Sequence, residues 1–168
     1  MELFLFRHGE AGKRLQSGSK DFDRPLTSTG QKEVESISIS LKKLKINFDR
    51  IITSPLKRAH QTAVIVSNVF VMEDNRVEDW GELKPEGNRL ELYKKLSQLK
   101  SDSSLLIIGH QPYLSEMIGN LIFDYDSDND PRIILKKSGL AKIVITSLMP
   151  TMKGELRWLL SPKLLRKI

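Results

Sequence analysis

Three short segments of the chain carry most of the side chains that could do chemistry. They are Arg7–Glu10, Ser54–Ala59 and Gly109–Pro112, which between them hold two histidines and two arginines. Arginine presents a planar fork of N–H donors that matches the oxygens of a phosphate group. A histidine with one ring nitrogen held by a hydrogen bond keeps a lone pair on the other and can act as a nucleophile. The segments therefore indicate a phosphate pocket in which phosphoryl transfer to a histidine is chemically available.

Each of these segments directly follows an apolar run. The runs are Leu3–Phe6, Arg50–Thr53 and Ser104–Ile108. Their composition is typical of strands buried on both faces of a sheet, and the first of them is expected to be a central strand. In open α/β sheets, ligands bind beyond the carboxyl ends of the strands. We therefore expect three independent strands to deliver His8, Arg58 and His110 to one crevice.

Helical patterns separate the apolar runs. Within Thr27–Leu44, apolar residues recur at three- and four-residue spacing, and a threonine or serine at the start can cap the helix. Ser54 and Pro55 have the residue types favoured at the N-cap and first position of a helix, which we expect to run to about Phe70. Two further helices are expected, over Asn88–Leu99 and Tyr113–Phe123.

The alternation of strands and helices predicts an α/β fold with a mostly parallel central sheet flanked by helices. The tail differs, because Ala141–Leu148 and Glu155–Leu160 flank a turn that contains proline and glycine. These two segments favour a C-terminal antiparallel strand pair. The length of 168 residues is close to that of one compact domain, and we expect residues 1–168 to form one.

Charge and composition narrow the classes of function. The chain has 27 Lys and Arg against 21 Asp and Glu, a net charge of +6, which favours acidic partners or phosphate-bearing substrates. It has no cysteine, which excludes thiolate metal sites, disulfides and cysteine nucleophiles. The apolar run at the N-terminus is too short for a signal peptide, and no stretch approaches the roughly 18–20 apolar residues that span a bilayer. We expect a cytoplasmic protein without membrane contacts and, by default, a monomer.

Two charged segments invite other interpretations. The acidic run Asp124–Asp130 superficially resembles a calcium loop, but Asn129 stands where glycine is required and Leu135 where the bidentate glutamate belongs. We therefore expect a solvated loop there, and no metal ion or other cofactor in the protein. Lys136, Lys137 and the C-terminal cations lack interleaved aromatic residues, so a nucleic-acid interface is not expected.

An ordered set of motifs spans nearly the whole chain and resembles the histidine phosphatase superfamily, and within it the small SixA-like phosphohistidine phosphatases. The motifs are Arg7-His8-Gly9, Arg24-Pro25-Leu26-Thr27 with Gly30, Ser54-Pro55 with Arg58-Ala59 and Gln61-Thr62-Ala63, Leu83-x-Pro85-x-Gly87, and Gly109-His110-x-Pro112. The resemblance implies the fold that this superfamily shares with the phosphoglycerate mutases. It also implies that His8 is the nucleophile and that His110 contacts phosphate from across the pocket.

The resemblance further implies that three arginines bind the phosphoryl group. Arg7 and Arg58 match the phosphate-binding arginines of the superfamily, and Arg24 matches a further phosphate contact of the small subfamily. Arginines placed in advance stabilise the charge that a phosphoryl group spreads over its equatorial oxygens during transfer.

A proton donor is less clearly marked. Glu82 lies about where larger members of the superfamily carry an acidic residue, although it could equally be a solvated loop glutamate. Glu10 and Asp21 are lesser candidates, and each could instead orient an arginine. The imidazole of a phosphohistidine is a good leaving group once it is protonated, so hydrolysis of this substrate does not need a strong proton donor from the protein.

The combined interpretation is a metal-independent phosphatase that forms a phosphohistidine on His8. The resemblance implies that larger members carry insertions that cover the pocket, and this chain has no room for them. The expected substrate is therefore a phosphohistidine on a partner protein, such as a histidine phosphotransfer domain. Lys13, Arg14, Lys20 and Lys57 are near enough to the motifs in sequence to form a basic rim, although each of them taken singly better fits a scattered charge that serves solubility. The alternatives are a phosphatase of a small phosphate ester or anhydride and, from another class, a non-catalytic module that binds phosphate or nucleic acid.

Overall fold

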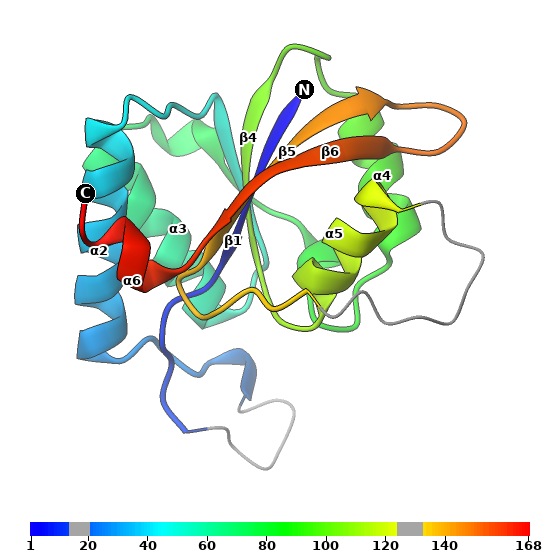
Figure 1. Cartoon of the computed structure of the whole chain (residues 1–168). Helices are drawn as coiled ribbons and strands as arrows, with labels where there is room; N and C mark the ends of the chain where they lie inside the picture. The colour runs from blue at the N-terminus through cyan, green and yellow to red at the C-terminus, as the bar shows by residue number, and fades with distance from the viewer. Residues whose placement is uncertain (14–20, 124–132) are drawn as a thin grey trace.

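A mixed sheet forms the centre of the computed structural model, which describes residues 1–13, 21–123 and 133–168 (Figure 1). Across these residues the strand order is β3-β2-β4-β1-β5-β6. The strands are β1 (Glu2–Arg7), β2 (Arg50–Thr53), β3 (Val77–Asp79), β4 (Ser104–Gly109), β5 (Leu140–Ser147) and β6 (Lys153–Leu160). The first four are parallel to one another, while β5 and β6 add an antiparallel pair next to β1. The predicted α/β fold with its C-terminal antiparallel pair is confirmed.

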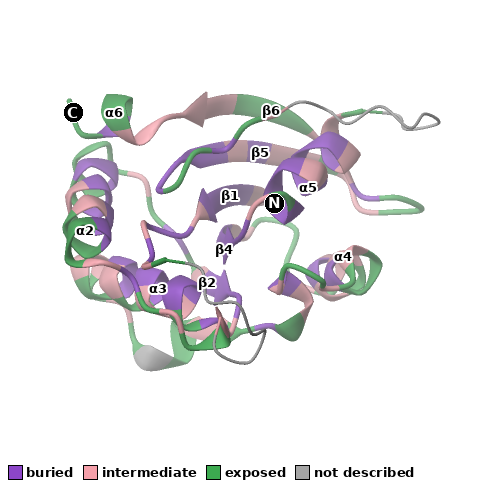
Figure 2. Ribbon diagram, turned by 90° about the horizontal axis from the view of Figure 1, so that it is seen from below, coloured by how far each residue is buried: buried purple, intermediate pink, exposed green. Residues whose placement is uncertain are grey.

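Helices cover both faces of the sheet. They are α2 (Ser28–Lys43), α3 (Lys57–Phe70), α4 (Arg89–Ser97), α5 (Tyr113–Ile122) and α6 (Pro162–Leu165), with short 3₁₀ turns η1 (Asp74–Arg76) and η2 (Gly81–Leu83). Helices α2, α3 and α6 lie on one face, and α4 and α5 lie on the other (Figures 1 and 2). None of the described helices is long and apolar enough to cross a membrane.

The alternation of side chains along β1 creates two cores. Leu3 and Leu5 pack into the cluster under α4 and α5, whereas Phe4 and Phe6 pack into the cluster under α2 and α3. Successive side chains of a strand point to opposite faces, so a strand with helices on both sides needs a continuous apolar run. This is why β1 has the apolar sequence that predicted a central strand, and its place between β4 and β5 confirms that prediction.

Three features differ from the predictions or were not predicted. Helix α3 begins at Lys57 with Leu56 as its N-cap, so the prediction that Ser54 caps this helix is wrong. The Ser54 hydroxyl forms a hydrogen bond with the His110 ring instead. Strand β3 has only three residues, two of them acidic, and α6 has four, so neither is long enough to show an apolar period.

Candidate active site

The carboxyl ends of β1, β2 and β4 bring the three chemically rich segments together. Arg7 pairs with Gly109 across β1 and β4, and Thr53 pairs with Ile108 across β2 and β4. His8 and His110, which follow β1 and β4, have ring centroids 5.0 Å apart, with the ring planes inclined by 58°. Both are buried, with exposed fractions of 6% and 2%. The predicted convergence at one edge of the sheet is therefore present.

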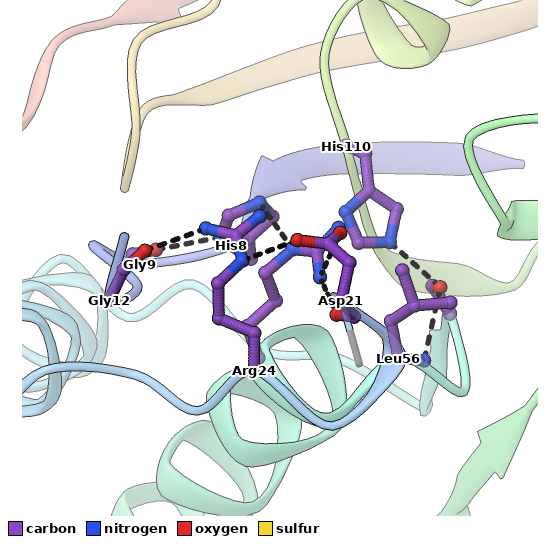
Figure 3. A network of polar contacts seen from close by, with 9 residues as sticks. His8, Gly9, Gly12, Asp21, Arg24, Leu56 and His110 are labelled. Atoms are coloured by element: carbon purple, nitrogen blue, oxygen red, sulfur yellow. Dashed lines mark hydrogen bonds and ion pairs between the residues drawn. The ribbon is translucent and has the colours of Figure 1, made fainter. Parts of the chain in front are cut away.

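Two hydrogen bonds determine the tautomer of His8. Its Nδ1 lies 2.7 Å from the carbonyl oxygen of Gly9, and a carbonyl can only accept, so Nδ1 carries the hydrogen and donates. Its Nε2 accepts a hydrogen bond from Nε of Arg58 at 3.2 Å (Figure 3). The lone pair of the ring therefore lies on Nε2 and faces the arginine. This is the arrangement that a nucleophilic histidine needs.

Burial and neighbouring positive charge keep both histidines neutral. The pKa of His8 is lowered to about 3, mainly by burial; the Gly9 hydrogen bond opposes this shift, and the charges of Arg58, Arg7 and Arg24 add to it. Burial likewise lowers the pKa of His110 to about 2, with His8 and the same arginines adding to the effect. At neutral pH the His8 lone pair is thus available for attack.

His110 receives its orientation from Ser54. The Nε2 atom of His110 lies 2.8 Å from the Ser54 hydroxyl, and that hydroxyl also accepts a bond from the backbone N–H of Leu56 at 3.4 Å. The other ring nitrogen, Nδ1, is buried and has no hydrogen-bond partner among the described residues. It lies on the edge of the ring that faces the His8 side of the pocket (Figure 3). If Ser54 donates its hydrogen to Nε2, the Nδ1–H of His110 is directed toward a phosphoryl oxygen.

Asp21 binds two of the predicted phosphate-binding arginines. Its carboxylate accepts a hydrogen bond from Nε of Arg24 at 2.7 Å and forms an ion pair with Nη1 of Arg58 at 3.3 Å. Its backbone oxygen accepts a second bond from Arg58 Nη1, at 2.9 Å. Arg24 in turn donates to the carbonyl of Gly12 at 2.9 Å (Figure 3). Of the roles considered for Asp21, the structure favours orienting arginines.

Arg7 is held by the loop before β5. Its Nη1 donates to the carbonyl of Leu135 at 2.9 Å, in the loop before β5. Its Nε is buried and has no partner within the described part of the chain. Burial lowers the pKa of Arg7 from its usual value. A buried donor without a partner is costly, and a phosphoryl oxygen in the pocket would satisfy it.

Thr62 connects the segment that follows β1 to helix α3, a role not predicted from the sequence. Its buried hydroxyl accepts the backbone N–H of Gly9 at 3.2 Å and donates to the carbonyl of Arg58 at 2.8 Å. Thr62 shares a helix face with Arg58, four residues away, which was the one available signal. That spacing alone fits a packing residue equally well.

Glu82 lies after β3 at the same edge of the sheet, but its carboxylate is engaged elsewhere. Its Oε1 forms an ion pair with Nζ of Lys95 at 2.9 Å. The hydrogen bond from Lys95 is the main cause that lowers the pKa of Glu82, which disfavours the protonated form that a proton donor requires. The charges that lower the pKa of His8 are those of arginines, and those that lower the pKa of His110 are His8 and the same arginines, so Glu82 is not among them. Its role as proton donor stays a prediction.

A close backbone contact explains why glycine follows the Arg24–Thr27 motif. A Cβ atom on Gly30 would lie 2.2 Å from the carbonyl oxygen of Glu10. The segment after His8 therefore lies directly on the first turn of α2. Thr27 caps that turn, since its hydroxyl accepts from the N–H of Gly30 at 2.9 Å and its own N–H donates to Glu10.

Some predicted features fall outside the described residues, namely Arg14, Lys20 and the acidic run Asp124–Asp130. Within residues 1–13, 21–123 and 133–168, no group of three or more histidine and carboxylate side chains is placed to hold a metal ion.

Comparison with known proteins places this site in a family. The family model described as the histidine phosphatase superfamily (branch 1) matches residues 3–91. The chain belongs to the histidine phosphatase superfamily. This histidine phosphatase is 34% identical over 129 residues to the phosphohistidine phosphatase SixA homolog of Haemophilus influenzae, covering 72% of this chain and 77% of that protein.

Two further comparisons cover nearly the whole histidine phosphatase. It is 28% identical over 164 residues to phosphohistidine phosphatase SixA of Escherichia coli, with 96% of this chain and 94% of that protein covered. A solved structure of the protein histidine phosphatase SixA complexed with tungstate superposes with a TM-score of 0.82 at 28% identity, covering 98% of this chain and 99% of that one. The superfamily and these relatives support phosphatase activity.

Proposed function

We propose that this histidine phosphatase removes the phosphoryl group from phosphohistidine on a partner protein, through a phosphohistidine formed on His8 and without a metal ion. The observation that carries the proposal is the His8 ring, whose Nδ1–H is held by Gly9 and whose Nε2 lone pair lies against Arg58. The SixA relatives support the substrate class. The SixA structure with tungstate supports a site for a tetrahedral oxyanion.

In the first step, Nε2 of His8 attacks phosphorus in line with the leaving group. A new P–N bond forms, and the bond between phosphorus and the substrate's ring nitrogen breaks. Its electron pair remains on the substrate imidazole, which carries a proton on its second nitrogen beforehand and so leaves as neutral histidine. Arg58 exchanges its hydrogen bond to Nε2 for contact with a phosphoryl oxygen. With Arg7 and Arg24 it stabilises the charge on the equatorial oxygens.

In the second step, water attacks phosphorus and the P–N bond to His8 breaks. The ring was formally cationic, with phosphorus on Nε2 and hydrogen on Nδ1, so it takes the electron pair back and becomes neutral. Both water hydrogens leave on the product, dihydrogen phosphate, which loses a proton to solvent at neutral pH. The Gly9 carbonyl stabilises the cationic ring throughout, because it accepts the Nδ1–H in every state.

The test is release of phosphate from a histidine-phosphorylated phosphotransfer domain in the presence of a chelator, with wild type and His8→Ala compared side by side. Wild type is expected to release phosphate and to carry acid-labile, base-stable phosphate transiently. His8→Ala should lose turnover by a factor of at least about 10³, since the nucleophile is gone. Circular dichroism of the variant checks that it is folded. Retained hydrolysis by the folded variant would refute His8 as nucleophile.

A substrate panel separates the proposal from the alternative of a small phosphate ester or anhydride. The specificity constant kcat/KM is measured for the phosphorylated domain, free phosphohistidine and simple phosphate esters. The proposal expects the phosphorylated domain to exceed every ester. An ester that is preferred by orders of magnitude would refute the assigned substrate class while leaving the chemistry on His8 in place.

A further inference from the structure

The loop before β5 is bound to the nucleophile strand through Arg7. The backbone N–H of Arg7 donates to Gly139, its backbone oxygen accepts from Ser138, and its side chain donates to Leu135. Leu135 and Ser138 are fully buried as a result. Lys136 and Lys137, between these two anchors, are both exposed. The fold therefore presents two lysines beside the end of β1, an arrangement that nothing in the local sequence pattern indicated.

A second set of exposed side chains lies around the two other arginines. Lys57 is exposed and directly precedes Arg58 at the start of α3. Lys13 is exposed and follows Gly12, whose carbonyl accepts from Arg24. Phe22 is 40% exposed although it is apolar, and it follows Asp21, which binds both arginines.

One more apolar side chain completes this surface. Ile134 is 71% exposed and adjoins Leu135, which binds Arg7. We call the exposed residues that adjoin these site residues in the chain the rim, defined as Lys13, Phe22, Lys57, Ile134, Lys136 and Lys137. Asp23, which follows Phe22 in the chain, is also exposed and carries a carboxylate. Exposed apolar side chains with charged side chains around them fit a protein-binding surface, in which apolar contacts have a polar periphery.

We infer that the rim is a docking surface for an acidic protein face that carries the phosphohistidine. This rests on the proposed function and adds the chemistry of the partner. Carboxylates around the partner's phosphohistidine would meet the four rim lysines, and an apolar patch would cover Phe22 and Ile134. Complementary charge raises the rate of encounter and orients the partner, so its effect falls on kcat/KM at low salt.

A protein fits this surface better than a nucleic acid. A terminal phosphoryl group can accept hydrogen bonds both from Arg58, which donates to His8, and from the buried Nε of Arg7, which has no partner among the described residues. Internal phosphodiesters of a nucleic acid carry a single charge and are linked on two sides, so they cannot enter the pocket end-on.

The experiment compares Lys136→Glu/Lys137→Glu with a matched control, Lys43→Glu/Lys100→Glu. The control lysines are also exposed but lie toward the amino ends of the strands. Lys43 ends α2, and Lys100 lies beside the loop that bonds to the start of β1. Each double variant changes the net charge by the same amount. Initial rates are measured with the phosphorylated phosphotransfer domain and with p-nitrophenyl phosphate, at low and at high salt. The milder Lys136→Gln/Lys137→Gln variant is measured alongside.

The rim variant is expected to lose about tenfold in kcat/KM toward the phosphorylated domain at low salt, with much of the loss abolished at high salt. Its kcat/KM toward p-nitrophenyl phosphate should stay within about threefold of wild type, and the glutamine variant should show a smaller loss of the same kind. The control should resemble wild type with both substrates.

Equal losses in the rim and control variants would overturn the docking surface, as would a rim variant that treats the phosphorylated domain like wild type. Inhibition of wild type by a single-stranded oligonucleotide that the rim variant abolishes would assign the surface to nucleic acid instead. The wild-type rate in the same assay tests the proposed function itself. A wild type that releases no phosphate from the domain refutes that function, whatever the lysines do.

Discussion

Replacing Thr62 by valine tests whether the contact between the nucleophile segment and helix α3 sets the position of His8. The Thr62 hydroxyl accepts the N–H of Gly9 and donates to the carbonyl of Arg58. Gly9 also supplies the carbonyl that holds the His8 ring. Valine keeps the shape of threonine but removes both hydrogen bonds. The Gly9 N–H is then left in a buried position without its partner.

The expected loss of stability follows from that orphaned donor. A buried, unsatisfied N–H costs about 1–3 kcal/mol, and the added methyl group of valine offsets part of this. A net cost of about 1–2 kcal/mol corresponds to a fall in Tm of about 2–8 °C for a chain of this size. Turnover should fall by about tenfold in kcat, because Gly9 can shift and carry the His8 ring away from in-line attack.

The assay pairs thermal unfolding with turnover and uses Thr62→Ser as the control. Serine keeps the hydroxyl and loses only a methyl group, so it also lowers Tm by an amount worth about 1 kcal/mol. Turnover rather than Tm therefore separates the two variants. We expect Thr62→Ser to retain kcat within about twofold of wild type. If Thr62→Val had the same kcat as Thr62→Ser, the proposed positioning of His8 through Thr62 would be refuted.

Three more predictions follow from the site. Gly30→Ala should lower both Tm and turnover, because its Cβ would lie 2.2 Å from the Glu10 oxygen, whereas Gly12→Ala, with nothing within 4 Å, should leave both close to wild type. Burial lowers the pKa of His8 to about 3, so between pH 6.5 and that value the unfolded chain binds a proton that the folded chain does not. The free energy of unfolding should therefore fall with decreasing pH, by up to about 1.4 kcal/mol per pH unit from His8, and denaturant unfolding of His8→Asn should show a correspondingly smaller slope. Glu82→Gln should keep turnover of the phosphorylated domain within about threefold, since the substrate imidazole brings its own proton; a hundredfold loss would instead establish Glu82 as the proton donor.

The strands that deliver the site could be predicted because their signals are local. Leu3–Phe6 is apolar at every position, as a strand covered on both faces must be, and a charged or polar catalytic segment follows it directly. The same holds for Ser104–Ile108 and the segment with His110. Parallel strands that end in such segments place them at one edge whatever the order of the strands. This is why the convergence could be expected without knowledge of the topology.

The role of Ser54 shows where local reasoning fails. Serine before proline has the residue types of a helix start, and the local pattern offered no other partner for its hydroxyl. In the structure its hydroxyl forms a hydrogen bond with His110, 56 residues away, and the helix starts at Lys57. The Ser54 hydroxyl could cap a helix or form a hydrogen bond with a distant side chain. The packing of β2 beside β4 decides between these two roles.

The sequence by itself determined the α/β class, because apolar periodicity is a local signal along the chain, and it predicted the residues of the pocket and their phosphate chemistry from residue type and motif order. Only the tertiary structure decided the strand order, the bridge of Asp21 between Arg24 and Arg58, and the link of Thr62 to Gly9. It also decided that Lys136 and Lys137 lie beside the nucleophile strand. Each of these depends on contacts between residues far apart in the chain, and such contacts are selected by burial and hydrogen bonding in the whole fold rather than by any local preference.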